Sequence, residues 1–138
     1  MKPITPSEAV AVLPAEKSVC DAALLRFEDL ISTQFWSQGD CKRMIDEGWI
    51  QTATVCVSEV PAYLLGYHFT DDGGLWIDIA QSLPGGTGDG RHLNQAIDMI
   101  AMKERRRYVR FYTARHGLVE FQRANGYEVE AVLLTKKI

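Results

Sequence analysis

The first fifty residues carry apolar side chains at helical spacing. The run from Thr5 to Glu8 is a typical helix entry, with Thr5 as the N-cap, and Pro14 would end this short helix. From about Ala15 to Phe35, apolar residues recur every three or four positions and predict an amphipathic helix. Its buried stripe consists of Cys20, Leu24, Phe27 and Ile31, with Ala23 and Leu30 beside it. Asp40 is a suitable cap for a further short helix that ends near Gly48.

After residue 50 the apolar positions alternate with polar ones, which is typical of strands. Residues 51–57 place Ala53, Val55 and Val57 on one face. The sequences at 58–61 and 71–74 have the composition of tight turns, and Asp-Asp-Gly-Gly at 71–74 is a strong hairpin signal. Strands over 51–57, 62–69 and about 75–82 therefore form an antiparallel meander.

Helices and strands alternate in the remaining third of the chain. A glycine-dense loop over 83–92 leads into a helix at about 92–106, and a strand follows at about 108–113. A second helix at about 116–124 ends at Asn125-Gly126, because glycine adopts the left-handed conformation at no steric cost. A last strand runs from Tyr127 to about Lys136. The order predicts an α/β (α+β) fold, with a mixed, mostly antiparallel sheet flanked by helices.

Length and composition are those of an ordinary globular protein. The chain has 138 residues, of which 46% are hydrophobic and 24% are charged, so it is long enough for one domain spanning residues 1–138. Its apolar runs are far too short for a membrane helix, and its first residues lack the apolar stretch of a secretion signal. The three cysteines are widely spaced and form neither a disulfide framework nor a zinc motif. We therefore expect a cytoplasmic protein that binds no metal and no membrane.

Charge is distributed unevenly along the chain. Residues 1–90 carry 5 Lys and Arg against 13 Asp and Glu, whereas residues 91–138 carry 10 against 5. The basic second half is suited to an anionic ligand, although the basic run at 103–107 also complements the C-terminal end of a helix. Because the net charge is −3 and no basic stripe is interleaved with aromatic residues, we expect no nucleic-acid partner.

The glycine-dense loop is the most informative chemical feature. A helix N-terminus offers unpaired N–H groups, and glycines let that backbone approach a phosphate closely. Arg91 and His92 could add cationic contacts, whereas the alternative is an exposed loop in which Asp89 only caps the helix. A P-loop needs Lys followed by Ser or Thr after its last glycine, which is absent here. A dinucleotide fold needs such a loop after the first strand of a parallel unit, and here an antiparallel meander precedes it.

The order of elements, the glycine loop after the third strand, Leu65-Gly66-Tyr67 and the ending Phe121 to Glu128 together resemble the GNAT N-acetyltransferase superfamily. The resemblance covers about Gln51 to the C-terminus and, more faintly, extends to reduced GNAT-like proteins of phages. The chain departs from the family at the start of the glycine loop, where Gln or Arg is usual. It also has Phe121 where a proton-donating tyrosine is common, and one predicted strand after Gly126 where two are usual.

The resemblance implies a site for acetyl-CoA as co-substrate. Its pantetheine arm would bind the strand backbone from Ile79 to Gln81, and its pyrophosphate would contact Gly86, Gly88, Gly90 and Arg91. Among relatives a strand carboxylate can act as general base, a role that would fall to Asp78 here. The alternative for Asp78 is a solvent-facing residue or a salt-bridge partner. Tyr112 could replace the missing acid, or could be packing.

For the other two histidines, the sequence favours positions without a chemical role. His68 lies in mid-strand and is predicted to be structural, and His116 is predicted to be an exposed residue that begins the last helix. Two functions stay open: an N-acetyltransferase acting on a small-molecule or protein amine, with the acidic first half favouring a cationic one, or a catalytically inactive GNAT-fold binding or assembly protein, for example in a phage particle. The absence of a second final strand would leave a sheet edge for a homodimer.

Overall fold

A computed structural model describes residues 9–25, 36–86, 88–113, 116–131, 134 and 136–138. Five strands form one sheet in the order β1-β2-β3-β4-β5. The strands are β1 (Val10–Pro14), β2 (Gln51–Val57), β3 (Val60–Phe69), β4 (Gly74–Ser82) and β5 (Tyr108–Arg110), and the helices are α1 (Lys17–Leu24), α2 (Gln38–Asp46), α3 (Gly90–Lys103) and α4 (His116–Ala124). The strands β1 to β4 are antiparallel neighbours, and β5 runs parallel to β4. The predicted mixed, mostly antiparallel sheet with flanking helices is confirmed.

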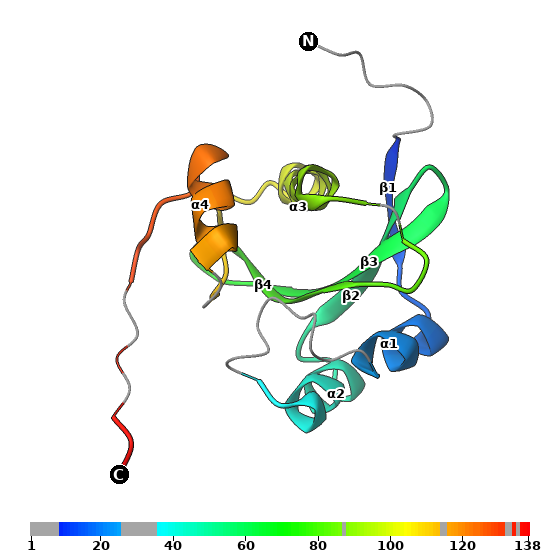
Figure 1. Cartoon of the computed structure of the whole chain (residues 1–138), viewed down its shortest axis with the longest axis horizontal. Coiled ribbons are helices and arrows are strands. Elements are labelled where there is room, and N and C mark those ends of the chain that lie inside the picture. The colour runs from blue at the N-terminus through cyan, green and yellow to red at the C-terminus, as the bar shows by residue number, and fades with distance from the viewer. Residues whose placement is uncertain (1–8, 26–35, 87, 114–115, 132–133, 135) are drawn as a thin grey trace.

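Helices cover both faces of the sheet. Figure 1 shows α3 and α4 on one face and α1 and α2 on the other. On the first face, Leu93, Ala96 and Ile97 of α3 pack against the main core of the sheet. On the second face, Leu24 and Cys41 pack against Ile79. Because both faces are covered, Thr54 and Cys56 are buried as well as the predicted inward set at 53, 55 and 57.

The N-terminal region differs from its prediction. Residues 10–14 form β1, which pairs with β2, so the short helix predicted to end at Pro14 is wrong for these residues. Val10 and Val12 alternate toward the main core, and this strand pattern prevails over the helix-entry signal, whose residues lie outside the described part. The helix predicted over 15–35 is described as α1 up to Leu24, and its stripe residues Phe27 and Ile31 lie outside the described residues.

Three other helix or strand boundaries differ from the predicted ones for identifiable reasons. Helix α2 is capped by Ser37, with Asp40 completing a capping box from inside the helix, so Asp40 is not the N-cap. Strand β3 begins at Val60, because Ser58 and Glu59 make the turn alone with φ values of 54° and 68°. Helix α3 ends at Lys103 instead of 106, because Arg105 adopts a left-handed φ of 53° and Arg106 N–H closes back on the Ala101 carbonyl.

The C-terminal region lacks its predicted strand. Strand β5 is limited to Tyr108–Arg110, and the described residues after Ala124 contain no strand, so the strand predicted from Tyr127 is wrong for these residues. Side chains hold this segment instead: Arg110 pairs with Glu130 at 2.6 Å, and the Phe111 and Tyr127 rings lie 5.3 Å apart. Within the described residues, β5 is thus the last strand at its edge, and the homodimer stays a prediction.

Candidate active site

A β-bulge in β4 shapes the centre of the site. Gly66 pairs with Ile79 and Tyr67 pairs with Ile77, so Asp78 is the extra residue between them. Leu75 and Ile77 pack toward α3, whereas Ile79 packs against Leu24 and Cys41 on the other face. Simple alternation along the strand predicts Leu75, Ile77 and Ile79 on one face, opposite Asp78. This prediction is wrong for Ile79, because the bulge at Asp78 interrupts the alternation.

Asp78 and His68 form a close pair across β3 and β4. Asp78 Oδ2 lies 2.6 Å from His68 Nδ1, and the exposed fractions of the two side chains are 8% and 37%. Burial raises the pKa of Asp78 above its ordinary value, and the hydrogen bond from His68 opposes that rise. When Nδ1–H donates to the carboxylate, Nε2 is left as an acceptor. Asp78 is thus a buried partner of a histidine and not a solvent-facing residue.

The sequence alone did not indicate that His68 could take part in proton transfer. A signal was present: His68 and Asp78 are polar residues within two strongly apolar strands that a tight turn pairs, and His68 lies opposite Trp76. Without the register of the hairpin, the separation of ten residues says nothing about contact. The bulge then brings the carboxylate into hydrogen-bonding distance of the imidazole.

Aromatic rings flank this pair. The His68 and Trp76 rings are stacked with centroids 6.3 Å apart, and the Tyr112 ring is tilted against Trp76 at 5.4 Å. Tyr112 is 48% exposed and its ring lies against Trp76, in agreement with the packing role considered for it from the sequence. The ring contacts therefore connect His68 of β3, Trp76 of β4 and Tyr112, which follows β5.

Strands β4 and β5 pair over three residues only. The last pair is Trp76 with Arg110, while β4 continues to Ser82. The predicted pantetheine region, Ile79 to Gln81, lies on this continuation, directly after the bulge. The Gln81 side chain is fully buried and donates to the Ala23 carbonyl, and no described residue pairs with its Oε1. Gln81 can thus meet a ligand through its backbone, whereas its side chain fastens α1 to the sheet.

The glycines of the loop after β4 are required by close packing. A Cβ on Gly86 would lie 2.7 Å from the Ala62 backbone, and one on Gly88 would lie 2.7 Å from the Tyr63 ring. A Cβ on Gly90 would lie 2.8 Å from the ring of Phe121, the residue at the position of the expected tyrosine. These approaches explain the glycines without any ligand, and they leave a phosphate only the opposite side of the loop.

The N-terminus of α3 is occupied by its own cap. Asp89 accepts from the N–H groups of Arg91 and His92, and His92 Nδ1 accepts from Asp89 N–H in return. The Arg91 guanidinium pairs with the same carboxylate at 3.0 Å, and this contact is the main cause of the lowered pKa of Asp89. The cap role considered for Asp89 is confirmed. A negative charge therefore sits where the predicted pyrophosphate contacts converge.

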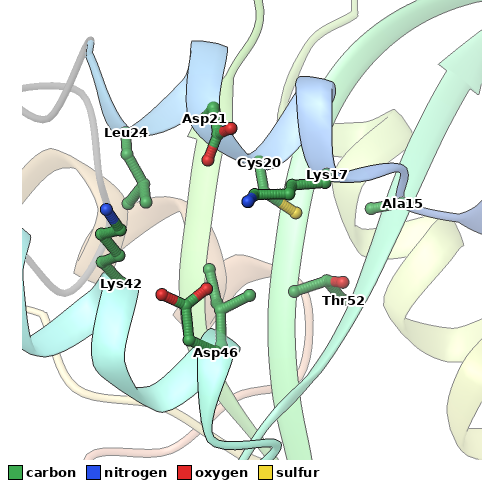
Figure 2. Close-up of a pocket in the computed structure, with 9 residues that line it drawn as sticks. Ala15, Lys17, Cys20, Asp21, Leu24, Lys42, Asp46 and Thr52 are labelled. Carbon is green, nitrogen blue, oxygen red and sulfur yellow. The ribbon is translucent and has the colours of Figure 1, made fainter.

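Two of the hollows on the surface of the described residues are relevant to the candidate site. The larger, about 1090 Å³, follows β5 between α4 and residues 126–131, and its lining includes Trp76 and Tyr112. The smaller, about 190 Å³, lies between α1 and α2; Figure 2 shows Lys17, Asp21, Lys42 and Asp46 around its rim. Burial raises the pKa of the Cys20 thiol at its base, which makes this cysteine a poor nucleophile. Neither of these two hollows is lined by His68 or Asp78.

Comparison with solved structures identifies the fold. A Trypanosoma brucei acetyltransferase matches with a TM-score of 0.58 and 14% identity over 94% of this chain and 100% of that chain. A possible acetyltransferase from Clostridium difficile matches with a TM-score of 0.59 and 15% identity over 95% and 99%. The chain has the GNAT acetyltransferase fold. An aminoglycoside N-acetyltransferase, solved in complex with CoA, shares this GNAT fold with a TM-score of 0.54 and 12% identity over 99% of both chains.

No protein-family model and no curated protein matches the sequence. Within the described residues, no group of three or more histidine, cysteine or acidic side chains could hold a metal ion, and no helix is long and apolar enough to cross a bilayer. His116 begins α4 as predicted, and its side chain lies outside the described set. The GNAT fold and the His68–Asp78 pair are thus the two findings on which a function can be built.

Proposed function

We propose that this GNAT-fold protein transfers an acetyl group from acetyl-CoA to an amine. The observation that carries the proposal is the 2.6 Å pair of His68 and Asp78 at the bulge of β4, immediately beyond the point where β4 and β5 separate. A buried carboxylate held against a partly exposed imidazole is costly in a merely structural role. It is a common arrangement where a proton must be removed near neutral pH.

Each residue has a chemical task in this proposal. His68 Nε2 accepts the proton that the attacking amine nitrogen loses, and Asp78 holds the imidazole tautomer and stabilises its charged form. Acetyl-CoA, when bound, supplies an activated thioester carbonyl. Backbone N–H groups of β4 beyond Trp76 would stabilise the charge that develops on the carbonyl oxygen. Tyr112 would return a proton to the departing thiolate.

The two ends of the donor site fit acetyl-CoA unequally. The β4 backbone around Ile79 has no β5 partner and is suited to the pantetheine arm. At the other end, Gly86, Gly88 and Gly90 add no side chains to the loop. The Asp89 carboxylate, however, already accepts hydrogen bonds from two N–H groups of α3. Arg91 would have to turn from Asp89 to a pyrophosphate, which its exposed position permits. We therefore expect weak donor binding.

The test is thermal unfolding with and without millimolar acetyl-CoA, with ATP as a control anion, followed by thiol release in the presence of amines. A ligand at 100 times its Kd adds about 2.7 kcal/mol to the free energy of unfolding. A shift specific to acetyl-CoA together with amine-dependent thiol release would support the transferase. Equal shifts with ATP and acetyl-CoA, or the absence of amine-dependent thiol release, would overturn it.

A second function, a GNAT-fold binding protein without catalysis, is favoured by two observations. Phe121 lacks the hydroxyl of the expected tyrosine and packs on Gly90. The Asp89 carboxylate accepts hydrogen bonds from the N–H groups at the start of α3 and would compete with a pyrophosphate for them. For such a protein, Asp78→Asn would leave partner binding unchanged. For the transferase, the same substitution would slow turnover while acetyl-CoA still binds.

A further inference from the structure

We propose that the hollow between α1 and α2 is a second binding site, and that it takes a free α-amino acid with an aliphatic side chain. This site is separate from the candidate active site, because neither His68 nor Asp78 lines it. The proposal does not depend on the transferase function. It is carried by three features of the described residues: the charges at the rim, the uncharged remainder of the lining, and the size of the hollow.

Four charged side chains of both signs surround the opening of the hollow. They are Lys17 and Asp21 of α1, and Lys42 and Asp46 of α2. Figure 2 shows their charged ends turned toward the space between the two helices, with Asp21 and Asp46 on opposite sides of it. Among these four described side chains, all of them exposed, no ion pair is formed. The two positive and two negative groups therefore do not neutralise one another by direct contact.

This balance of charge favours a zwitterion. A ligand with a single charge meets as many like charges as opposite ones at the rim, so attraction and repulsion largely cancel. An amino acid carries an ammonium group and a carboxylate on the same carbon atom, and it can turn the first toward an aspartate and the second toward a lysine. Such charge-assisted hydrogen bonds are stronger than those between neutral groups. The rim is therefore suited to a ligand with both charges at one end.

The remainder of the lining carries no charge. It consists of Ala15, Cys20, Leu24, Ile45 and Thr52, of which Cys20 and Leu24 are buried. Burial raises the pKa of the Cys20 thiol, so this group is neutral at pH 7. An aliphatic side chain that enters first removes apolar surface from water on both partners. The charged end of the ligand then stays at the exposed rim, where it keeps part of its hydration.

The size of the hollow suits such a molecule. Its volume of about 190 Å³ equals that of about six water molecules in the liquid. Leucine, with nine non-hydrogen atoms, has nearly this volume, whereas glycine would leave most of it empty. Both helices are fastened to β4, because Gln81 donates to the Ala23 carbonyl of α1 and Cys41 of α2 packs against Ile79. Little ordering of the protein is therefore needed when the ligand binds.

The first experiment follows the backbone amide signals of the full chain by NMR, without acetyl-CoA. We titrate L-leucine and three relatives: 3-methylbutylamine, which lacks the carboxylate, 4-methylpentanoate, which lacks the ammonium group, and glycine, which lacks the side chain. The signals of Lys17, Asp46 and Thr52 should shift with a leucine Kd of roughly 0.1–2 mM, the range for a ligand of this size. Each relative should bind at least about 5-fold more weakly.

Each alternative outcome of this titration contradicts one part of the proposal. Equal binding of leucine and a singly charged relative would overturn the preference for a zwitterion, and equal binding of glycine would overturn the aliphatic class. If about 20 mM leucine shifts none of the signals around the hollow, there is no binding site, and the rim charges do no more than hold α1 beside α2. None of these results bears on acetyl transfer, because acetyl-CoA is absent and the signals lie outside the candidate active site.

Matched variants on α2 test the rim. Lys42→Gln and Asp46→Asn each remove one charge that lines the hollow, and each should raise the leucine Kd about 2- to 5-fold, as expected for exposed ion pairs. Arg43→Gln and Glu47→Gln are the controls. These neighbours pair with each other at 3.3 Å and do not line the hollow, so the Kd should be unchanged. The same change of Kd in both sets would contradict a site at this rim.

A variant that fills the hollow gives the largest expected effect. Ala15→Leu adds to the lining the same isobutyl group that leucine carries, and it should abolish saturable binding. Ala22→Leu, at an exposed position of α1 outside the lining, is the control and should leave the Kd unchanged. Full leucine binding by Ala15→Leu would overturn the proposed position of the ligand. If Ala15→Leu fails to fold, the leucine titrations of the α2 variants decide the question.

Discussion

The two ends of the candidate site differ in how the chain uses its polar groups. At the loop end, the side chains of Asp89, Arg91 and His92 hydrogen-bond with one another or with backbone N–H groups of the helix start. At the bulge end, the partner of Asp78 among the described residues is His68, which is partly exposed. The first arrangement is sufficient to stabilise a helix start, so it needs no ligand to explain it. The second leaves an imidazole nitrogen for chemistry, and this contrast indicates where function is concentrated.

The contrast also separates what a GNAT fold requires from what a transferase requires. Glycines in the loop after β4 are explained here by packing against Ala62, Tyr63 and Phe121. The His68–Asp78 pair has no such explanation, because a buried carboxylate lowers stability unless its charge is compensated. A protein that kept only the fold could replace both residues with apolar ones.

The largest expected effect is that of His68→Gln, which tests the bulge end. Loss of a general base typically slows transfer by roughly 100- to 10,000-fold, and glutamine cannot take up the proton at neutral pH. We expect kcat to fall by that factor while the KM for acetyl-CoA is unchanged, as measured by thiol release. His92→Gln, at the loop end, is the matched control and should leave kcat near that of the parent. If both variants lose the same activity, the histidines share a structural role.

The next effect tests the loop end by volume. In Gly88→Ala the new methyl group would lie 2.7 Å from the Tyr63 ring, and such overpacking typically costs about 1–3 kcal/mol in the free energy of unfolding. Gly117→Ala is the control, because its Cβ meets nothing within 4 Å and α4 should gain about 0.5–1 kcal/mol from the better helix former. Urea unfolding measures both. A Gly88→Ala variant as stable as the parent would mean that the loop is not packed as described.

Sequence reasoning recovered the elements whose signals are local. The hairpin at 71–74, the helix that follows the glycines and the cap at Asp89 depend on neighbouring residues, and each is present. The strand at 10–14 was missed because Val10 and Val12 become a strand only when β2 lies beside them. The strand predicted from Tyr127 is absent in the described residues 127–131, where side-chain contacts such as Arg110 with Glu130 hold the segment instead.

The candidate site was predicted in part for the same reason. Asp78 stood out as a carboxylate in an apolar strand, which is visible in the sequence. Its pairing with His68 depends on a bulge, and one extra residue in a ladder leaves no distinctive pattern in one strand read alone. The ion pair of Arg91 with Asp89 likewise depends on the geometry of the helix start, which the sequence permits but does not require.

A smaller effect tests whether the pyrophosphate binds at the loop end. Asp89→Asn retains an oxygen that can cap α3 and removes one negative charge. Because like charges about 4 Å apart in water repel by about 1 kcal/mol, the Kd for acetyl-CoA should fall about 3- to 10-fold. Calorimetric titration measures this, and the gain should shrink in high salt. Asp71→Asn, in the β3–β4 turn, is the control and should leave Kd unchanged. An unaltered affinity in Asp89→Asn would place the pyrophosphate elsewhere.

The subtlest effect compares the two ends through the pH dependence of stability. Burial raises the pKa of Asp78 above 3.8, so the folded state holds its proton more tightly and this stabilisation is lost as pH rises through the folded pKa. The Arg91 contact lowers the pKa of Asp89 below 3.8, so its stabilisation is present above that value and is lost as pH falls. Urea unfolding between pH 3 and 7 should therefore give difference curves of opposite slope: relative to the parent, Asp78→Asn gains stability as pH rises and Asp89→Asn loses it. Slopes of the same sign would mean that folding shifts the pKa values of the two carboxylates in the same direction. The distinction between a reactive bulge end and a loop end whose polar groups pair with one another would then be wrong.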